Sequence, residues 1–358
     1  MITRQRGVVR EKIATRIERA ISDEVFPGCV VGVIDRSGTR EIFPFGRFTY
    51  DMSAPDMSED AVFDVASVTK SIPTSTLALM LIDRGELAAD TRVVEYLPEL
   101  QTNFNDDIRM QHLLTHTLDF RVRLSALKDL PPEKILQEIY TTHFEKPPGT
   151  AYCYSNASSI LLGICLRRAA DKPLDRLAGE MLFEPLQMHA TTFHPQTVDI
   201  ARIVPTEYDD WRGRLIRGEV HDESAWVLSR QSPAGSAGLF STAPDLLNFL
   251  QMLLNNGRID NHYCISSDMI RRMHTNQLSI DGMRTGLGWE LCRRRYMGDA
   301  CSDMTFGKTG FTGCVCLCDP AKGRALVFLS NFTYPRRKSS RNLINDIRKD
   351  IADMVFAT

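Results

Sequence analysis

Three short motifs in this 358-residue chain contain residue types that could perform nucleophilic catalysis. Ser67 and Lys70 form an S-x-x-K motif, Tyr154 and Asn156 bracket a serine, and residues 308–310 read Lys-Thr-Gly. A serine hydroxyl can attack a carbonyl carbon when a neighbouring amine or phenol accepts its proton. The motifs therefore predict serine-based chemistry that requires no histidine, metal or cofactor.

The spacing of Ser67 and Lys70 favours a locally built pair, because positions i and i+3 of a helix share one face. The apolar segment 61–66 precedes them, and the pattern of residues 74–85 predicts a helix after them. We expect Ser67 at a helix N-terminus, where free N–H groups favour developing negative charge. Burial there would lower the pKa of Lys70. Pro73 falls inside the predicted helix, so we also expect its first turn to be irregular. The alternative is a surface N-cap serine followed by a solvated lysine.

Composition and charge limit the possible partners. The chain is 43% hydrophobic and 25% charged, enough for one large domain or two that share a cleft. A formal net charge of −2 provides no excess of basic residues with which to bind nucleic acid. We interpret the basic run 336–338 as the solvated start of the last helix. Residues 1–11 are polar, so we expect neither a signal peptide nor a membrane anchor and predict a cytoplasmic location.

Nine cysteines, scattered through apolar segments, indicate buried reduced thiols rather than a disulfide framework. Cys314, Cys316 and Cys318 alternate with apolar residues, as on one face of a buried strand, and this pattern does not favour a metal site. His112 and His116 have the spacing of a zinc pair but no intervening glutamate. We expect His116 to be a hydrogen-bonded structural residue.

The order of predicted elements indicates an α+β fold, an α/β/α sandwich. Residues 8–24 and 339–356 read as helices, and a hairpin turn is predicted at 36–38. The late strands are predicted at 286–291, 309–318 and 325–330. We expect one antiparallel sheet of about five strands, flanked by the N- and C-terminal helices.

The largely helical middle of the chain is predicted to be an inserted lobe. The expected division is an α/β domain of residues 1–66 plus 261–358 and a helical domain of residues 67–260. The active site would lie in the cleft between them.

Further blocks of sequence resemble one known family. They include Phe-Pro-Gly at 26–28, Leu-Leu-Thr-His-Thr at 113–117, Pro-Gly-Thr at 148–150, 183–188, 238–242 and Gly-Leu-Gly-Trp at 286–289. With the three motifs, they make the chain similar to the serine β-lactamase and penicillin-binding-protein superfamily, specifically its class C-like branch. That branch also contains esterases, D-amino-acid peptidases and acyltransferases. The resemblance spans nearly the whole chain and implies the fold more specifically than the substrate.

The resemblance implies a role for each motif residue. Ser67 would be the acylated nucleophile, Lys70 its proton-accepting partner, and Tyr154 a phenol that shares the proton transfer. A free phenol has a pKa near ~10, so Lys70 and Lys308 would have to stabilise its anion. Either Lys70 or Tyr154 could be the general base. Asn156 would donate its amide to a substrate carbonyl and steady Lys70.

The Lys-Thr-Gly motif is predicted to open a strand, with the small Gly310 letting substrate lie against Thr309 and the strand edge. The resemblance implies an oxyanion hole formed by the backbone N–H groups of Ser67 and Phe311. Esterases of the branch often carry histidine or tryptophan at the position of Lys308. A lysine there favours a substrate carboxylate.

We therefore predict a serine hydrolase that forms an acyl-enzyme on Ser67 and cleaves ester or amide (β-lactam-like) bonds of small substrates. A D-amino-acid peptidase or an acyltransferase is the alternative within this fold. The alternative from another class is a non-catalytic assembly or ligand-binding protein. We expect an ester, β-lactam or peptide-like partner, no nucleic acid and no membrane, and no oligomeric state follows from the sequence. Residues 221–223 are expected to lie either at the cleft or in a solvated loop.

Overall fold

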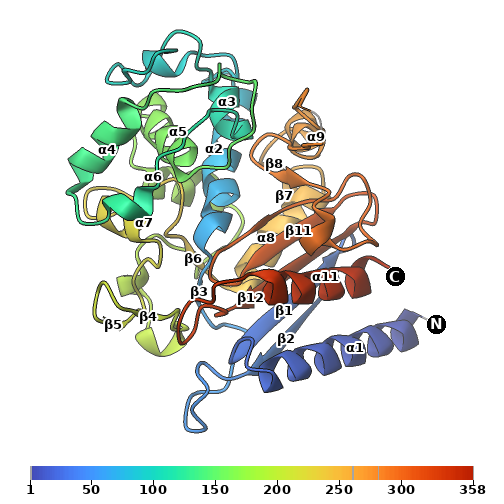
Figure 1. Ribbon diagram of the computed structural model, residues 1–358. Helices are drawn as coiled ribbons and strands as arrows, with labels where there is room; N and C mark the ends of the chain where they lie inside the picture. The colour runs from blue at the N-terminus through green and yellow to red at the C-terminus, as the bar shows by residue number, and fades with distance from the viewer. Residues whose placement is uncertain (1, 260–261, 281, 358) are drawn as a thin grey trace.

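The computed structural model describes residues 2–259, 262–280 and 282–357 (Figure 1). One part of it is a six-stranded antiparallel sheet with the strand order β2-β1-β12-β11-β10-β9. Its strands are β1 (Gly28–Asp35), β2 (Arg40–Gly46), β9 (Glu290–Leu291), β10 (Phe306–Thr309), β11 (Val315–Asp319) and β12 (Arg324–Ser330). The predicted antiparallel sheet of about five strands is confirmed, and the short β9 is its sixth strand.

Helices cover both faces of this sheet. Helix α1 (Ile2–Ser22) and helix α11 (Asn342–Phe356) pack side by side on one face (Figure 1). Helix α8 (Ala243–Leu254) packs against β1, β11 and β12 on the other face. The predicted α/β/α sandwich with N- and C-terminal helices is therefore confirmed.

Strand β11 divides its side chains between these two layers. Val315 and Leu317 pack with α1 and α11, whereas Cys314, Cys316 and Cys318 join the core on the α8 side. The prediction that the three thiols share one face is thus confirmed. All nine cysteines are free, six of them buried and three half-buried.

Most remaining helices lie beside one end of the sheet (Figure 1). They are α2 (Thr76–Asp83), α3 (Met110–Thr115), α4 (Pro132–Tyr140), α5 (Asn156–Ala169), α6 (Leu174–Ala178) and α7 (Glu223–Leu228), with α9 (Ser267–His274) and α10 (Arg294–Met297) following later in the chain. The minor strand pairs are β3 (Phe63–Asp64) with β6 (Phe240–Ser241), β4 (Tyr208–Asp209) with β5 (Arg214–Leu215), and β7 (Arg258–Ile259) with β8 (His262–Tyr263).

The predicted division into residues 1–66 plus 261–358 and residues 67–260 stays a prediction. Its boundary at 260 and 261 lies outside the described residues. Helix α8 falls within the range predicted as helical, yet it packs on the sheet, so we group it with the sheet here.

Residues 309–318, predicted as one strand, contain the last residue of β10, a turn and then most of β11. A Cβ atom placed on Gly310 would lie 2.4 Å from Val65 O, so the turn packs directly against the segment that precedes the S-x-x-K motif. The prediction that Lys308, Thr309 and Gly310 open a strand is therefore wrong. The first two residues end β10, and the third turns the chain.

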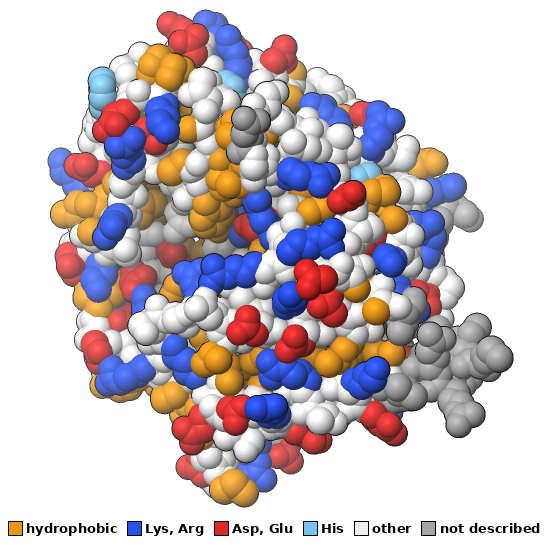
Figure 2. All heavy atoms as spheres, turned by 45° about the vertical axis from the view of Figure 1, so that its right-hand side comes forward, with side chains coloured by type: hydrophobic (Ala, Val, Ile, Leu, Met, Phe, Trp, Pro, Cys, Tyr) orange, Lys and Arg blue, Asp and Glu red, His pale blue; other side chains and the backbone are white. Residues whose placement is uncertain are grey.

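The basic run 336–338 precedes α11 instead of starting it, because that helix begins at Asn342. The interpretation of the run as the start of the last helix is therefore wrong. Arg336 and Arg337 are exposed, as expected of a solvated segment, and Arg337 also forms an ion pair with the buried Glu207. On the face drawn in Figure 2, basic and acidic side chains are interspersed. Among the described residues, no helix has both the length and the apolar character needed to span a bilayer. The cytoplasmic location stays a prediction.

A glycine contact joins α5 to the segment that supports Lys70. A Cβ atom placed on Gly235 would lie 2.3 Å from Ser159 O, closer than any side chain can approach. The next residue, Ser236, offers its carbonyl oxygen to Lys70 Nζ at 2.7 Å. The close approach therefore sets the position of one hydrogen-bond partner of the lysine.

We predict that Gly235→Ala lowers the free energy of unfolding by about 1–3 kcal/mol, because the added methyl group must displace helix backbone. Urea denaturation measures the difference. Gly179→Ala is the matched control, since its Cβ atom would find its nearest neighbour, Glu184 Oε1, at 3.9 Å. A Gly235→Ala protein as stable as this control would contradict the packing described.

Candidate active site

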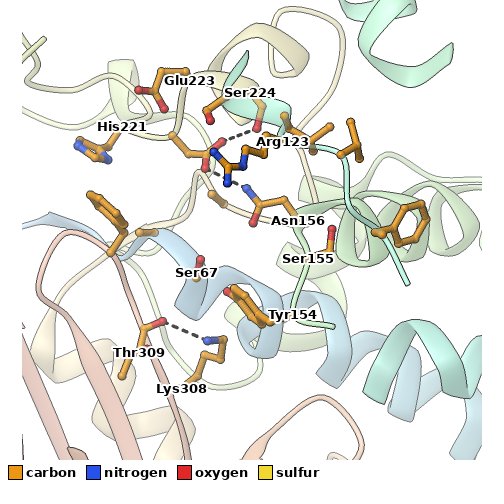
Figure 3. Close-up of a pocket in the computed structure, with 18 of the residues that line it drawn as sticks. Ser67, Arg123, Tyr154, Ser155, Asn156, His221, Glu223, Ser224, Lys308 and Thr309 are labelled. Atoms are coloured by element: carbon orange, nitrogen blue, oxygen red, sulfur yellow. Dashed lines mark hydrogen bonds between the residues drawn. The ribbon is translucent and has the colours of Figure 1, made fainter. Parts of the chain in front are cut away.

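The three motifs meet on the wall of one pocket of about 730 Å³. Ser67 comes from the turn before α2, Tyr154 and Asn156 from the start of α5, and Lys308 from the end of β10. Figure 3 shows Ser67, Tyr154 and Lys308 around the same space. Of the predicted site residues, those that line the pocket are Ser67, Tyr154, Asn156, Lys308, Thr309 and Phe311. Lys70 lies buried behind Ser67, and Gly310 precedes Phe311 in the adjoining turn.

Ser67 lies in a 3₁₀ turn, η1 (Ala66–Lys70), not at the start of a regular helix. The π-helical turn η2 (Ser71–Ser75) follows, and Ile72 within it has non-helical angles of φ −119° and ψ 108°. The irregular turn predicted around Pro73 is confirmed. Because α2 begins only at Thr76, its dipole contributes less at Ser67 than the sequence suggests.

Lys70 is a candidate proton acceptor for Ser67. Its Nζ lies 2.9 Å from Ser67 Oγ, and the side chain is buried. Burial lowers the pKa of Lys70, and the nearby charge of Lys308 lowers it further, against opposing contributions from Tyr154 and Asp222. A buried amine with a lowered pKa can take a proton from a hydroxyl at hydrogen-bond distance.

Tyr154 lies between two cations. Lys308 Nζ is 4.6 Å and Lys70 Nζ 5.3 Å from the centroid of its ring. Desolvation raises the pKa of Tyr154, but Lys308, Lys70 and a hydrogen bond with the Ser67 hydroxyl outweigh it, so the pKa falls below the ordinary tyrosine value. The residue is 41% exposed and lines the pocket, so the phenol is open to a bound substrate.

Lys308 has an internal counterion that sequence reasoning missed. Its Nζ lies 2.7 Å from Glu290 Oε1, and both side chains are largely buried. Burial opposes the charge on Lys308, yet Glu290 and Tyr154 raise its pKa above the ordinary lysine value. Lys308 therefore keeps its proton, but its charge is already compensated. This weakens the expectation that it binds a substrate carboxylate.

Asn156 contacts a different residue from the one expected. Its Nδ2 donates to Asp222 Oδ2 at 3.0 Å, a bond dashed at the labelled Asn156 in Figure 3. Asp222 also caps α7. In the described part of the chain, no hydrogen bond joins Asn156 to Lys70. Lys70 Nζ instead donates to the carbonyl oxygen of Ser236, so the contact predicted between Asn156 and Lys70 is not the one that holds the lysine.

Two residues of the pocket wall have backbone N–H groups without a protein acceptor among the described residues. Within residues 2–259, 262–280 and 282–357, neither the Ser67 N–H nor the Phe311 N–H donates a hydrogen bond. Both residues line the cavity. A pair of free N–H groups suits an oxygen that gains negative charge during acyl transfer.

The two histidines near the motifs each accept a backbone hydrogen bond. His116 Nδ1 accepts the Ser155 N–H at 3.5 Å, and burial, with the charges of Lys70 and Lys308, lowers its pKa to about 3. His112 Nδ1 accepts the Arg109 N–H at 3.1 Å. The hydrogen bond expected for His116 is present, and its structural role stays a prediction.

Residues 221–223 line the pocket, so the first of their two predicted positions is confirmed. Arg337 and Arg341, which the motifs did not indicate, line it as well. Position in the sequence could not reveal them, because they lie between β12 and α11, far from every motif.

Residues 13–348 match the profile of the family described as Beta-lactamase. The chain belongs to the beta-lactamase family. Two relatives, from Escherichia coli strain K12 and Escherichia coli O157:H7, are named "Putative D-alanyl-D-alanine carboxypeptidase". They are 29% and 30% identical over 301 residues, which cover 75% of this chain and 69% of each relative. The predicted resemblance and the predicted enzyme class, a serine hydrolase, are confirmed.

Solved structures share the beta-lactamase-family fold at low identity. EstCE1, titled a hydrolase with promiscuous acyltransferase activity, has a TM-score of 0.77 at 20% identity, covering 97% of this chain and 98% of its own. A penicillin-binding protein homologue from Caulobacter crescentus has a TM-score of 0.75 at 16% identity, covering 98% and 97%. Unliganded simvastatin synthase from Aspergillus terreus, as its selenomethionyl derivative, has a TM-score of 0.76 at 19% identity, covering 96% and 97%.

The charges around Tyr154 predict a pH dependence. Lys308 lowers the pKa values of both Tyr154 and Lys70, so Lys308→Met should raise both, whichever group is the base. The pH at which kcat/KM rises should move upward by about one unit or more. Glu290→Gln removes a charge that raises the Tyr154 pKa. In this variant, kcat/KM should therefore begin to rise at a lower pH than in the wild type.

The pH profile of ester hydrolysis measures both shifts, and Lys308→Arg is the control that keeps the charge. Shifts of Lys308→Met and Glu290→Gln in the same direction would contradict this electrostatic account.

Proposed function

We propose that this beta-lactamase-family chain hydrolyses small esters or amides, β-lactams included, through an acyl-enzyme on Ser67. The observation that carries the proposal is the 2.9 Å contact between Ser67 Oγ and the buried Lys70 Nζ on the wall of the pocket. A serine beside a desolvated amine is an activated nucleophile.

In the first half-reaction, Ser67 Oγ attacks the substrate carbonyl carbon and gives its proton to the coupled pair of Lys70 and Tyr154. The N–H groups of Ser67 and Phe311 receive the negative oxygen of the tetrahedral intermediate. Asn156 borders the same space and can orient the substrate amide or ester. The leaving group departs with a proton returned by the pair, and an ester to Ser67 remains.

In the second half-reaction, water attacks this ester, and the same pair accepts the proton of the water. Ser67 regains its hydrogen when the tetrahedral intermediate collapses, and the acid is released. An alcohol that replaced water would receive the acyl group instead, which is the reaction of an acyltransferase.

The charges on the pocket wall indicate a substrate with an anionic group. Glu290 compensates Lys308, and Glu207 and Glu223 compensate Arg337. Arg123 and Arg341 differ, because among the described residues no carboxylate pairs with either of them. Of these two, Arg341 lies over the Phe311 ring, 4.2 Å from its centroid, and so beside a proposed oxyanion donor. We therefore assign the substrate carboxylate, expected at Lys308 from the sequence, to the neighbourhood of Arg341.

This assignment suits two substrate classes. β-Lactams and peptides that end in D-alanine both carry a carboxylate close to the bond that is cleaved. The relatives named as carboxypeptidases make the peptides a reasonable test substrate. A neutral short-chain ester tests the reaction without this contact.

Replacing the nucleophile is the first test. Ser67→Ala should lower the turnover of a chromogenic short-chain ester and of a chromogenic cephalosporin by on the order of 10³-fold or more, because no acyl-enzyme can form. Mass spectrometry of the wild-type protein should find the acyl group on the peptide that contains Ser67. Ser125→Ala, at another serine of the pocket wall, is the control and should remain active. Unchanged turnover in Ser67→Ala would rule the proposal out.

Replacing Arg341 tests the substrate class. Arg341→Met should raise KM for a carboxylate-bearing substrate by about 10-fold, since a hydrogen bond to a charged group contributes about 1.5–3 kcal/mol. KM for a neutral ester should change little, and Arg341→Lys should restore part of the loss. Arg336→Met is the control, because Arg336 is an exposed arginine paired with Asp210. An equal change of KM for anionic and neutral substrates would contradict the assignment.

A further inference from the structure

The two free N–H groups of the pocket must point at one substrate oxygen, although they belong to segments far apart in the sequence. We propose that Asp64 is a positioning residue that sets the separation and orientation of the Ser67 and Phe311 donors. The inference rests on the proposed function and deepens it, because it names what holds the oxyanion site in shape. Three contacts of Asp64 lead to it.

The first contact controls the Ser67 donor. Asp64 is 1% exposed, and its Oδ1 accepts the Ala66 N–H at 2.8 Å. Ala66 has a φ of 47°, in the left-handed region that a residue with a side chain adopts only when its surroundings hold it there. The carboxylate therefore holds the strained residue that immediately precedes Ser67.

The second contact controls the backbone of the Phe311 donor. Thr312 Oγ1, one residue further along, donates to the Asp64 carbonyl oxygen at 2.8 Å. From the other side, the buried Arg348 donates to Gly310 O at 2.9 Å. The peptide N–H of Phe311 is thus fixed between two anchors, one of which is Asp64.

The third contact controls the side chain of Phe311. Asp64 Oδ2 accepts the His221 N–H at 2.7 Å, and the His221 ring stacks on the Phe311 ring with centroids 5.5 Å apart and an interplanar angle of 27°. Arg341 also lies over this ring, at 4.2 Å. Asp64 therefore reaches Phe311 through its backbone neighbour and through the ring that packs on it.

A positioning role explains why a carboxylate is buried here. Burying a carboxylate costs free energy, and an apolar residue of similar size often gives equal or greater stability. Only an acceptor with two oxygens can hold the Ala66 and His221 N–H groups at once. Asparagine keeps the shape of Asp64 but can accept only one of these two bonds.

The first test uses Asp64→Asn with an ester substrate. Removing one oxyanion donor typically lowers kcat by 10²–10³-fold, so misplacing one should lower kcat by roughly 10–100-fold. KM should change less than about threefold, since the donors act mainly in the transition state.

Because Asp64→Asn could fail to fold, Thr312→Val provides a second variant that leaves the carboxylate in place. It removes only the hydroxyl that anchors the Phe311 turn, and it should lower kcat by about 10-fold, whereas Thr312→Ser should restore kcat. Thr333→Val is the matched control, because Thr333 is also 1% exposed and donates its hydroxyl to a backbone carbonyl, Thr206 O, at 2.9 Å. This control should retain wild-type kcat.

The readout that separates positioning from stability is the ratio of kcat/KM for an ester and for its thiono analogue. Sulfur accepts hydrogen bonds weakly, so an intact oxyanion site favours the ester, and the ratio should fall in Asp64→Asn and Thr312→Val. Wild-type kcat and ratio in Thr312→Val, or a lower kcat with an unchanged ratio in both variants, would overturn the inference. Activity of Ser67→Ala would instead overturn the proposed function.

Discussion

The site depends on the cost of burying two lysine amines on either side of one phenol. Two neighbouring amines cannot both keep a positive charge in a desolvated space unless a negative charge compensates one of them. Glu290 contacts Lys308 at 2.7 Å, whereas Lys70 donates to the neutral oxygens of Ser67 and Ser236 and forms no ion pair with a carboxylate in the part of the chain that the structure describes. The first lysine therefore remains a cation and the second gives up its proton more easily. The same residue type is suited to two roles because one glutamate lies near only one of them.

The sheet and the helical segments beside it both supply these groups. Lys308 ends β10, and the pairing of β10 with the short β9 covers only Phe306 and Gly307, so the end of the strand is left open toward the pocket. The same pairing places Glu290, opposite Gly307, close enough to reach the lysine. On the helical side, the close approach at Gly235 positions the carbonyl that holds Lys70. The strand pairing at Gly307 and the backbone approach at Gly235 thus determine where Lys308, Glu290 and Lys70 lie.

How much of this the sequence could predict depends on the range of each contact. Ser67 and Lys70 are three residues apart, so their pairing follows from local geometry, and the alternation at 314–318 predicted the two faces of β11 correctly. The strand predicted at 309–318 failed because Gly310 turns where the chain approaches Val65, a contact between distant segments. Glu290 was missed for the same reason, since its partner is set by the register of β9 on β10.

Charge compensation also separates the chemistry from the choice of substrate. If Lys308 serves to stabilise the phenolate of Tyr154, its charge cannot also be fully available to a substrate carboxylate, because Glu290 already neutralises it. Recognition then falls to residues outside the motifs, such as Arg341. Such residues can change without disturbing proton transfer. A fold can therefore keep one set of reacting groups while its members accept different acyl compounds, and motifs alone indicate the reaction better than the substrate.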